Sequence, residues 1–352
     1  MCFANGMKID APLMTAELAQ VPTEARELEA LGYDGTYTFE GRSDPFFPLL
    51  LGAEHTTRIE LATAVAIALP RNPLQLAHVC HDLQVFSRGR FVLGLGSQIK
   101  THIEKRYGAT WSKPIAHMRE LVLALKAIWR CWNENERLDF RGEFYRHTLM
   151  IPTFAPPPSP VGPPRVLMAG VGAPMTAAAA EVADGIIIHP LHSPEFIRQT
   201  TLPALHKGFT RSGRTGAEFE IACQAMVITG FTEEEFRLAE QTTRGSVAFY
   251  SSTPAYRVVL ETHGWGPLQD ELNTLSKQGR WAEMSGLIDD RMLDTLTIRC
   301  EPKDLPVRLQ ARYGGLVDRI GISCYHGRPD RGDPAAWKDI IAACKQVPAV
   351  HV

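Results

Sequence analysis

Short apolar runs alternate with longer segments of helical periodicity along most of the chain. Eight runs have the β-branched and aromatic bias of strands, and they span residues 8–13, 33–39, 59–67, 90–96, 165–170, 185–190, 220–230 and 317–324. Strands separated by helices must pair in parallel, because a parallel neighbour requires a long crossover connection. Eight strand-helix units in 352 residues predict an α/β protein with a (β/α)₈ TIM barrel and insertions.

Polar residues followed by proline mark several of the expected helix starts. Ser, Thr, Asn and Asp are good N-caps, and proline is favoured at the first helical position. The pairs are Asp44-Pro45, Asn72-Pro73, Ser193-Pro194 and Thr253-Pro254. Thr232 and Glu235 have the spacing of a capping box. The positions of these signals agree with the predicted alternation of strands and helices.

Two segments interrupt this rhythm, at about 135–164 and 253–300. The first alternates like a hairpin with Arg141-Gly142 at its turn and then becomes proline-rich; the second has the composition of several short helices. We therefore expect one barrel domain over residues 1–352 with two insertions. A doubly wound sheet is the alternative, but it would normally carry G-x-G-x-x-G after its first strand, where this chain has "MTAEL".

Composition excludes several classes of function. With 37 basic and 39 acidic residues, the net charge of −2 gives no electrostatic reason to expect nucleic acid or an anionic membrane as a partner. Seven cysteines without a C-x-x-C pair are typical of reduced thiols. No run of about 18 apolar residues and no signal peptide is evident. We expect a cytoplasmic protein whose partner is a small organic molecule.

The active site of a parallel barrel lies at the carboxyl ends of its strands, so the residues that follow the strands are the candidates. Glu40 follows the second strand, where it could pair with Arg42, cap the next helix, contact a cofactor or move a proton. His102 is a second candidate for proton transfer. His189 and His192 follow another strand, as ligand contacts or as core histidines. His78 and His81 lie within a helix without a third metal ligand, which favours a structural role and no metal site.

Glycines mark two further candidate binding segments. In "AGVGAP", residues 169–174, two glycines between a strand and an alanine-rich helix could present backbone N–H groups to a phosphate, or could serve only a tight turn. In "GLGSQ", residues 94–98, glycines at a strand end could admit a flat ligand or allow close strand packing. The sequence leaves both pairs of interpretations open.

Several blocks together resemble the bacterial luciferase-like superfamily, in particular its coenzyme F420-dependent oxidoreductases. The blocks are "ALGYDGTYTFE", "DPFFPLLLGAEHTTRIELATAV", "RNPLQLAHVCHDLQVFSRGRFVLGLGSQ", "FRGEFYRH" and "AGVGAPMTAAAAEVADGIIIHP", within about residues 7–209. Ser87, Gly89, Arg90 and Phe91 match a specific motif of the family, with Arg88 in place of its usual glycine.

The resemblance implies a flavin or deazaflavin at the strand ends of a barrel. It places a non-prolyl cis peptide that forms a bulge behind the cofactor ring at Ala64-Val65, and a phosphate loop at Gly170, Val171, Gly172 and Ala173. With Ser97, Gln98 and Ala169, these are the expected cofactor-binding residues. Glu40 stands where many deazaflavin enzymes of the family have a histidine, so the histidine's proton role does not transfer directly.

The resemblance thus implies hydride transfer between coenzyme F420 and an organic substrate bound under the 253–300 insertion, with Glu40 and His102 as catalytic candidates. A reduced-FMN-dependent monooxygenase is the alternative, and a non-catalytic flavin-binding or deazaflavin-binding barrel is a third. Barrels of this family often dimerise, so a homodimer is also possible.

Overall fold

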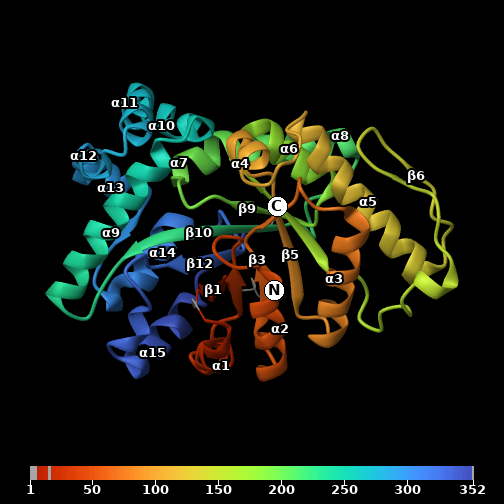
Figure 1. Ribbon diagram of the computed structural model, residues 1–352. Coiled ribbons are helices and arrows are strands. Elements are labelled where there is room, and N and C mark those ends of the chain that lie inside the picture. The colour runs from red at the N-terminus through yellow and green to blue at the C-terminus, as the bar shows by residue number, and fades with distance from the viewer. Residues whose placement is uncertain (1–5, 15–16, 351–352) are drawn as a thin grey trace.

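The computed structural model describes residues 6–14 and 17–350. Eight parallel strands form a closed barrel, and all eight predicted strands are confirmed (Figure 1). In barrel order they are β1 (Lys8–Pro12), β2 (Gly35–Thr38), β3 (Glu60–Thr63), β5 (Phe91–Gly96), β8 (Arg165–Gly170), β9 (Gly185–Ile188), β10 (Glu220–Ile228) and β12 (Arg319–Ser323). The pairing of β1 with β12, with Ile9 opposite Ile320, closes the barrel.

Helices surround the barrel. They are α1 (Val21–Ala30), α2 (Phe46–His55), α3 (Pro73–Phe86), α4 (Lys100–Lys105), α5 (Pro114–Glu134), α6 (Ala173–Val182), α7 (Pro194–Phe196), α8 (Leu202–Ser212), α9 (Glu233–Ser251), α14 (Leu305–Tyr313) and α15 (Pro334–Cys344). A π-helical turn, Ile197–Thr201, joins α7 to α8. Apolar faces of most of these helices and of the strands form one continuous core around the barrel, whereas buried residues of α7 and α9 belong to a second apolar cluster.

Most of the predicted helix starts are confirmed by side-chain caps. Asn72 accepts from Leu74 N–H at 2.9 Å, Ser193 accepts from Phe196 N–H at 3.0 Å, and the capping box of Thr232 and Glu235 is present. The second helix begins at Phe46, one residue later than Asp44-Pro45 suggests, although Asp44 still accepts from Phe46 N–H. Thr253-Pro254 begins only a 3₁₀ turn, Pro254–Tyr256, without a side-chain cap.

Both interrupting segments have the local structure that was expected. The first contains the antiparallel hairpin β6 (Phe140–Arg141) and β7 (Arg146–His147), after which the chain is mostly irregular up to β8. The second contains α10 (Arg257–Glu261), α11 (Gly266–Lys277), α12 (Trp281–Gly286) and α13 (Asp290–Leu296), which pack with α9 around their own apolar cluster. The short strand β11 (Ile298–Arg299) then adds to the edge of β10. The division into one domain with two insertions remains a prediction.

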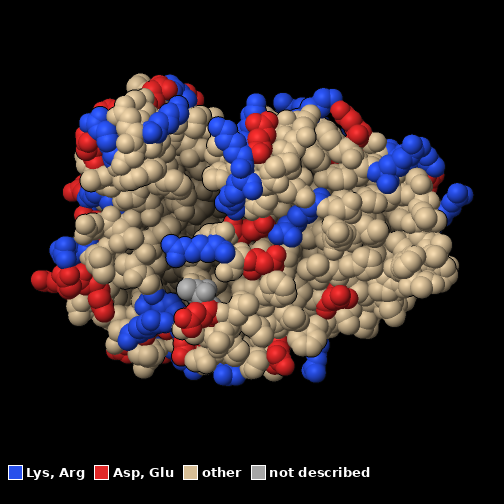
Figure 2. All heavy atoms as spheres, viewed as in Figure 1, with Lys and Arg blue, Asp and Glu red and all other residues tan. Residues whose placement is uncertain are grey.

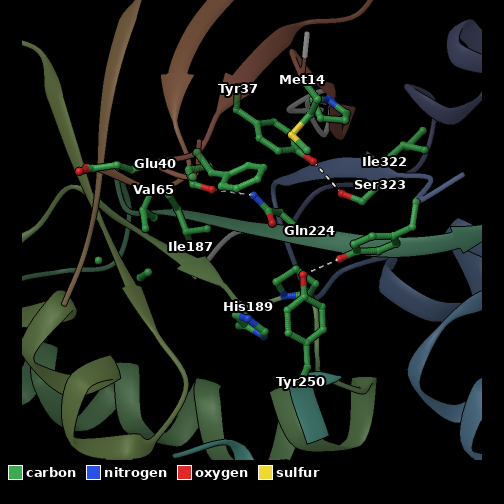
Figure 3. Close-up of a pocket in the computed structure, with 18 of the residues that line it drawn as sticks. Met14, Tyr37, Glu40, Val65, Ile187, His189, Gln224, Tyr250, Ile322 and Ser323 are labelled. Atoms are coloured by element: carbon green, nitrogen blue, oxygen red, sulfur yellow. Dashed lines mark hydrogen bonds between the residues drawn. The ribbon is translucent and has the colours of Figure 1, made fainter. Parts of the chain in front are cut away.

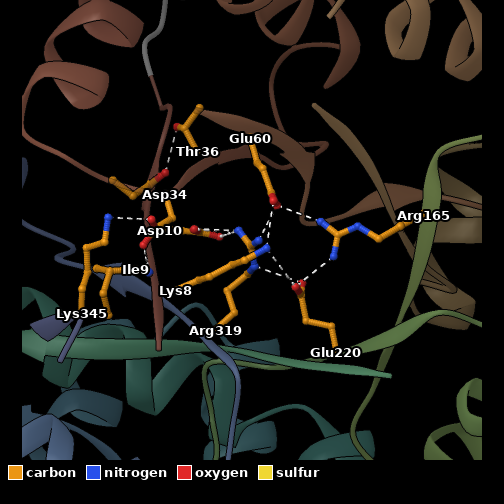
Figure 4. A network of polar contacts seen from close by, with 11 residues as sticks. Lys8, Ile9, Asp10, Asp34, Thr36, Glu60, Arg165, Glu220, Arg319 and Lys345 are labelled. Atoms are coloured by element: carbon orange, nitrogen blue, oxygen red, sulfur yellow. Dashed lines mark hydrogen bonds and ion pairs between the residues drawn. The ribbon is translucent and has the colours of Figure 1, made fainter. Parts of the chain in front are cut away.

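One end of the barrel is filled by an ion-pair cluster (Figure 4). Its members are Lys8, Asp10, Glu60, Arg165, Glu220 and Arg319, and five of them are the first residues of their strands. Arg319, only 6% exposed, donates to both oxygens of Asp10 at 2.8 Å, to Glu220 at 3.0 Å and to Glu60. The amino ends of the strands are therefore closed, which leaves the carboxyl ends for a ligand.

No helix in the described part of the chain is long and apolar enough to cross a membrane.

Candidate functional site

A cavity of about 970 Å³ opens at the carboxyl ends of the barrel strands. This volume lies at the upper end of the range usual for sites that bind small molecules. Figure 2 shows a hollow on this side of the molecule, between the lobe formed by α10–α12 and the rest of the face, with Lys and Arg side chains on its rim. Figure 3 shows side chains from several strands that converge on the cavity.

Nearly all the predicted cofactor-binding residues line this one cavity. Those that do are Ala64, Val65, Ser97, Gln98, Ala169, Gly170, Val171 and Gly172. Ala173 is exposed at the first position of α6 and is not among the lining residues. The two catalytic candidates, Glu40 and His102, also contribute to the lining.

The third strand is interrupted by a bulge at Ala64 and Val65. The peptide bond between them is cis, as expected, and the strand resumes as β4 (Ala66–Ile67), which pairs with β5. Three hydrogen bonds hold the bulge: Ala64 N–H donates to Thr38 O at 2.6 Å, Ala64 O accepts from Gln224 Nε2 at 3.3 Å, and Val65 O accepts from Glu40 N–H at 3.1 Å. The bulge thus presents a small apolar surface to the cavity.

The two glycines of β5 allow close packing, and one of them also contributes to the cavity. A Cβ added to Gly94 would come within 1.9 Å of Thr63 O, and one added to Gly96 within 2.5 Å of Val65 Cγ2. Gly94 therefore serves strand packing, which was one of the two interpretations. Gly96 supports the bulge and lines the cavity.

The turn between β8 and α6 is built around Gly172. β8 ends at Gly170 and α6 begins at Ala173, with Gly172 as its N-cap in extended backbone geometry. The first N–H groups of a helix have no partner within the helix, and together with the helix dipole they favour an anion. A Cβ on Gly172 would find its nearest neighbour, Pro174 Cδ, at 3.8 Å, so space remains above the turn.

Ser97 and Gln98 bond mainly to their own loop. Ser97 Oγ donates to Gln98 O at 3.1 Å, and Gln98 Oε1 accepts from Ile99 N–H at 3.0 Å. Gln98 has a φ of 59°, which turns the chain from β5 toward α4. This loop brings His102 to the cavity, and no side chain in the described ranges hydrogen-bonds to the His102 imidazole.

Glu40 has three hydrogen-bond donors around its carboxylate. Oε2 accepts from Ile67 N–H and from Arg71 Nη2, each at 2.8 Å, and Oε1 accepts from the Tyr107 hydroxyl at 2.9 Å. In Figure 3 its side chain extends away from the other labelled residues. The expected neighbour Arg42 donates none of these bonds; its place is taken by Arg71, which is 31 positions away in the sequence.

His189 and His192 have different environments. His192 is buried, with Nδ1 bonded to His189 O at 2.8 Å and Nε2 to the Tyr313 hydroxyl at 2.9 Å, so it is a core histidine. His189 lines the cavity, with its imidazole centroid 4.2 Å from that of Tyr256 and 4.8 Å from that of Tyr250. Burial, and then the neighbouring His192, lower the pKa of His189 to about 3.

A set of hydroxyl groups in the cavity was not predictable from local sequence patterns. The Tyr37 hydroxyl lies 2.7 Å from Ser323 Oγ, and the Tyr250 hydroxyl lies 3.1 Å from that of Tyr325 (Figure 3). Burial raises the pKa of Tyr37, Tyr250 and Tyr325, so these hydroxyls stay protonated. Each pair joins segments that are far apart in the sequence, and only the closed barrel brings them together.

His78 and His81 pack against Trp132, with centroid separations of 4.6 Å and 5.7 Å, so their role is structural as expected. Across residues 6–14 and 17–350, no group of three or more His, Cys, Asp or Glu side chains is arranged to hold a metal ion.

Relatives that match most of the chain include two mycobacterial proteins. An uncharacterised protein of Mycobacterium tuberculosis is 47% identical over 317 residues, which cover 90% of this chain and 93% of the relative. A putative coenzyme F420-dependent oxidoreductase of the same organism is 28% identical over 302 residues, covering 80% and 84% of the two chains.

Solved structures with this fold include a coenzyme F420-dependent enzyme and an enzyme in complex with FMN. The coenzyme F420-dependent tetrahydromethanopterin reductase of Methanopyrus kandleri superposes with a TM-score of 0.77 at 19% identity, covering 97% of this chain and 98% of that one. The oxygenating constituent of 3,6-diketocamphane monooxygenase from Pseudomonas putida, in complex with FMN, has a TM-score of 0.66 at 14% identity, covering 98% of both chains.

The model of the luciferase-like monooxygenase family matches residues 3–319. This match spans the barrel strands from β1 to the start of β12 and includes the bulge and the α6 turn, whereas the cavity-lining residues from 322 to 331 lie beyond it. The chain therefore belongs to the luciferase-like monooxygenase family.

Proposed function

We propose that the protein is a coenzyme F420-dependent oxidoreductase that transfers a hydride between the deazaflavin and an organic substrate. The observation that carries this proposal is that the cis bulge at Ala64-Val65 and the glycine turn at the start of α6 open on the same cavity. The bulge suits a flat ring system and the glycine turn suits a phosphate. A flavin or deazaflavin cofactor has both of these parts.

The residues present fit such a cofactor. The apolar side chains of Ala64 and Val65 would lie behind the ring, and the space above Gly172 gives a phosphate access to the free N–H groups of the first turn of α6. Ser97 and Gln98 would border the ring from β5. When bound, the deazaflavin supplies a carbon that gives or accepts a hydride, which no side chain of the protein can do.

The protein's own groups position the ligands and limit the access of water. Glu40 fixes Arg71 and the backbone of Ile67 beside the bulge. Gln224 donates to Ala64 O in the bulge, and the Tyr37 and Ser323 hydroxyls bond to each other. A proton-transfer role for Glu40 or His102 remains part of the proposal. His102 is the freer of the two, because both oxygens of Glu40 already accept hydrogen bonds.

The second candidate is a reduced-FMN-dependent monooxygenase. It is favoured by the likeness of the fold to a monooxygenase in complex with FMN, and the cavity is large enough for either cofactor with a substrate. A sequence relative at 28% identity is named for coenzyme F420, and among the two structures the coenzyme F420-dependent one has the higher TM-score, 0.77 against 0.66; for this reason we place the deazaflavin first. A non-catalytic binding barrel would bind the cofactor without turnover of any substrate.

An oxygen-uptake experiment separates the redox alternatives. The protein would be mixed in air with reduced coenzyme F420, and separately with reduced FMN, in the presence of a panel of uncharged ketones. We expect reoxidation of coenzyme F420 that depends on a ketone and consumes no oxygen. Oxygen uptake that depends on FMN and on the substrate, without any reaction of coenzyme F420, would replace our proposal with the monooxygenase.

A further inference from the structure

Ring packing alone does not explain why His189 lies in the cavity. It follows β9 directly, and its imidazole meets the side chain of Tyr250 edge-on at an interplanar angle of 87° (Figure 3). The centroid of the Tyr256 ring lies 4.2 Å from that of the imidazole. Unlike the His192 imidazole, which has partners at both nitrogens, the His189 imidazole has one nitrogen bonded within the protein.

The bonded nitrogen determines which tautomer His189 adopts. Nδ1 accepts a hydrogen bond from Leu191 N–H at 3.1 Å, so in the neutral imidazole the proton is on Nε2. Burial lowers the pKa of His189 to about 3, which keeps the imidazole neutral at ordinary pH. No side chain or backbone group in the described ranges accepts a bond from Nε2. His189 therefore offers the cavity a fixed, uncharged N–H donor.

A second uncharged donor lies beside the first. The Tyr250 and Tyr325 hydroxyls are 3.1 Å apart, and when one donates to the other, the accepting hydroxyl keeps its own proton for a ligand. Burial raises the pKa of both groups. The Tyr250 side chain also contacts His189, so the two donors belong to the same part of the cavity.

The carboxylates that line the cavity already have cationic partners. Glu40 pairs with Arg71 at 2.8 Å, Asp330 with Arg328 at 2.6 Å, and Glu24 with Arg331 at 3.7 Å. The side chains that contact the His189 imidazole are the aromatic rings of Tyr250 and Tyr256, and the ionisable neighbour that acts on its pKa is His192. An ionised substrate group placed there would lose its hydration without gaining a charged partner, which is costly. An uncharged acceptor oxygen meets no such penalty.

We propose that His189 Nε2–H and the Tyr250–Tyr325 hydroxyl pair bind the oxygen of an uncharged carbonyl or alcohol substrate, with its apolar body against Tyr256. The substrate class rests on the proposed function, whereas the binding site stands on its own geometry. A neutral imidazole can polarise a carbonyl through an N–H bond, and neutral donors bind more strongly as the oxygen gains negative charge. His189 is thus a substrate-positioning residue.

The test uses three probes of similar shape with the purified full chain: acetophenone as a neutral ketone, ethylbenzene without the oxygen, and benzoate as an anion. Affinities are measured by calorimetry for the wild type, for His189→Phe, which removes the donor, and for His189→Gln, which restores an N–H donor. The surface variant His206→Gln serves as a control on α8. Nitrogen NMR of protein labelled at histidine reports the His189 tautomer directly, assigned by its loss in His189→Phe.

We expect acetophenone to bind about three- to tenfold more tightly than ethylbenzene or benzoate. This preference should disappear in His189→Phe, return in part in His189→Gln and persist in His206→Gln. The NMR spectrum should show an Nε2–H tautomer from pH 5 to 9 whose signal shifts on addition of acetophenone.

Four results would overturn the inference: a preference for benzoate, an unchanged preference in His189→Phe, a His189 imidazole that becomes protonated near pH 6.5, or a complete lack of acetophenone binding. Binding of coenzyme F420, measured separately, decides the proposed function, so either idea can fail while the other stands.

Discussion

Glu40 shows how the surroundings of a single residue change its interpretation. An acidic side chain at a strand end has the position of a proton-transfer group, but here its carboxylate accepts bonds from Arg71, Ile67 N–H and Tyr107. Two of these partners come from the next strand-helix unit. These hydrogen bonds tie that unit to β2 beside the bulge.

Replacing Glu40 with glutamine tests this interpretation. Glu40→Gln removes the nearer of the two carboxylates paired with the partly buried Arg71 guanidinium and leaves only Asp44, at 3.8 Å, so we expect the free energy of unfolding to fall by about 1–3 kcal/mol. A double-mutant cycle in urea denaturation with Arg71→Gln should show that the two losses are not additive. Additive losses, or unchanged stability with turnover reduced a hundredfold, would instead support a proton role for Glu40.

Positions near the cavity were predictable where a residue follows a strand or matches a family motif. The cofactor-binding candidates all line the cavity except Ala173, while their binding role stays a prediction. The pairing of Tyr37 with Ser323 joins residues 286 positions apart, and that of Tyr250 with Tyr325 joins residues 75 positions apart. No local pattern indicates such pairs, because they depend on the closure of the barrel.

At the scale of elements, the turn into α6 is the most specific feature of the site. The sequence left open whether its glycines serve a phosphate or only a tight turn. Gly172 has a φ of −78°, which any residue can adopt, and open space above it. Backbone geometry alone therefore does not require glycine at position 172, which favours a role in ligand access.

A pair of nearly isosteric variants separates charge from shape at this turn. Both Gly172→Asp and Gly172→Asn place a good N-cap at α6, so neither should lower the stability of the fold. The carboxylate of Gly172→Asp would repel a phosphate, and we expect it to weaken cofactor binding at least tenfold more than Gly172→Asn does, as measured by fluorescence titration. Equal affinities for the two variants would mean that no anion binds at this helix start.

The strands themselves were the most predictable elements. Each predicted run contains a barrel strand, because a strand buried on both faces appears in the sequence as a continuous apolar segment. The bulge within 59–67 came from the family resemblance, since nothing in the periodicity of that run predicts it. The role of the 253–300 segment was only partly predictable: residues 253, 255 and 256 line the cavity, but α10–α13 mainly pack around their own core.

At the scale of the whole molecule, the two ends of the barrel have different tasks. The amino end is closed by three cations and three carboxylates centred on Arg319, and the carboxyl end holds the cavity. In TIM barrels the carboxyl end carries function and the amino end stability. This division predicts that changes in the ion cluster affect folding more than ligand binding.

Two variants within the cluster should differ in their cost. Arg319→Met removes a buried cation and leaves Asp10 and its neighbours without their central partner, which we expect to lower the free energy of unfolding by about 3–5 kcal/mol. Lys8→Met removes a cation that is 39% exposed, and we expect a loss below about 1 kcal/mol. Urea denaturation measures both, and similar losses would contradict the central role of Arg319.

Stability should also decrease in acid through this cluster. Burial disfavours ionisation of Glu60, but Arg319, Arg165 and Lys8 outweigh burial and lower its pKa to about 2; the pKa of Glu220 is lowered in the same way. A carboxylate with a depressed folded-state pKa stabilises the fold above its unfolded pKa, and this stabilisation is lost as the pH falls. We expect the free energy of unfolding to drop between about pH 4.5 and 2, and to drop less in Glu60→Gln. An equally steep decline in that variant would assign the acid sensitivity to other groups.

The central claim is that this barrel holds a deazaflavin, and a binding titration tests it most directly. Oxidised coenzyme F420 and, separately, FMN would be titrated with the purified protein, following fluorescence quenching and polarisation. We predict saturable binding of coenzyme F420 that is at least tenfold tighter than that of FMN and is weakened in Gly172→Asp. Tighter binding of FMN, or binding of neither compound, would contradict the account.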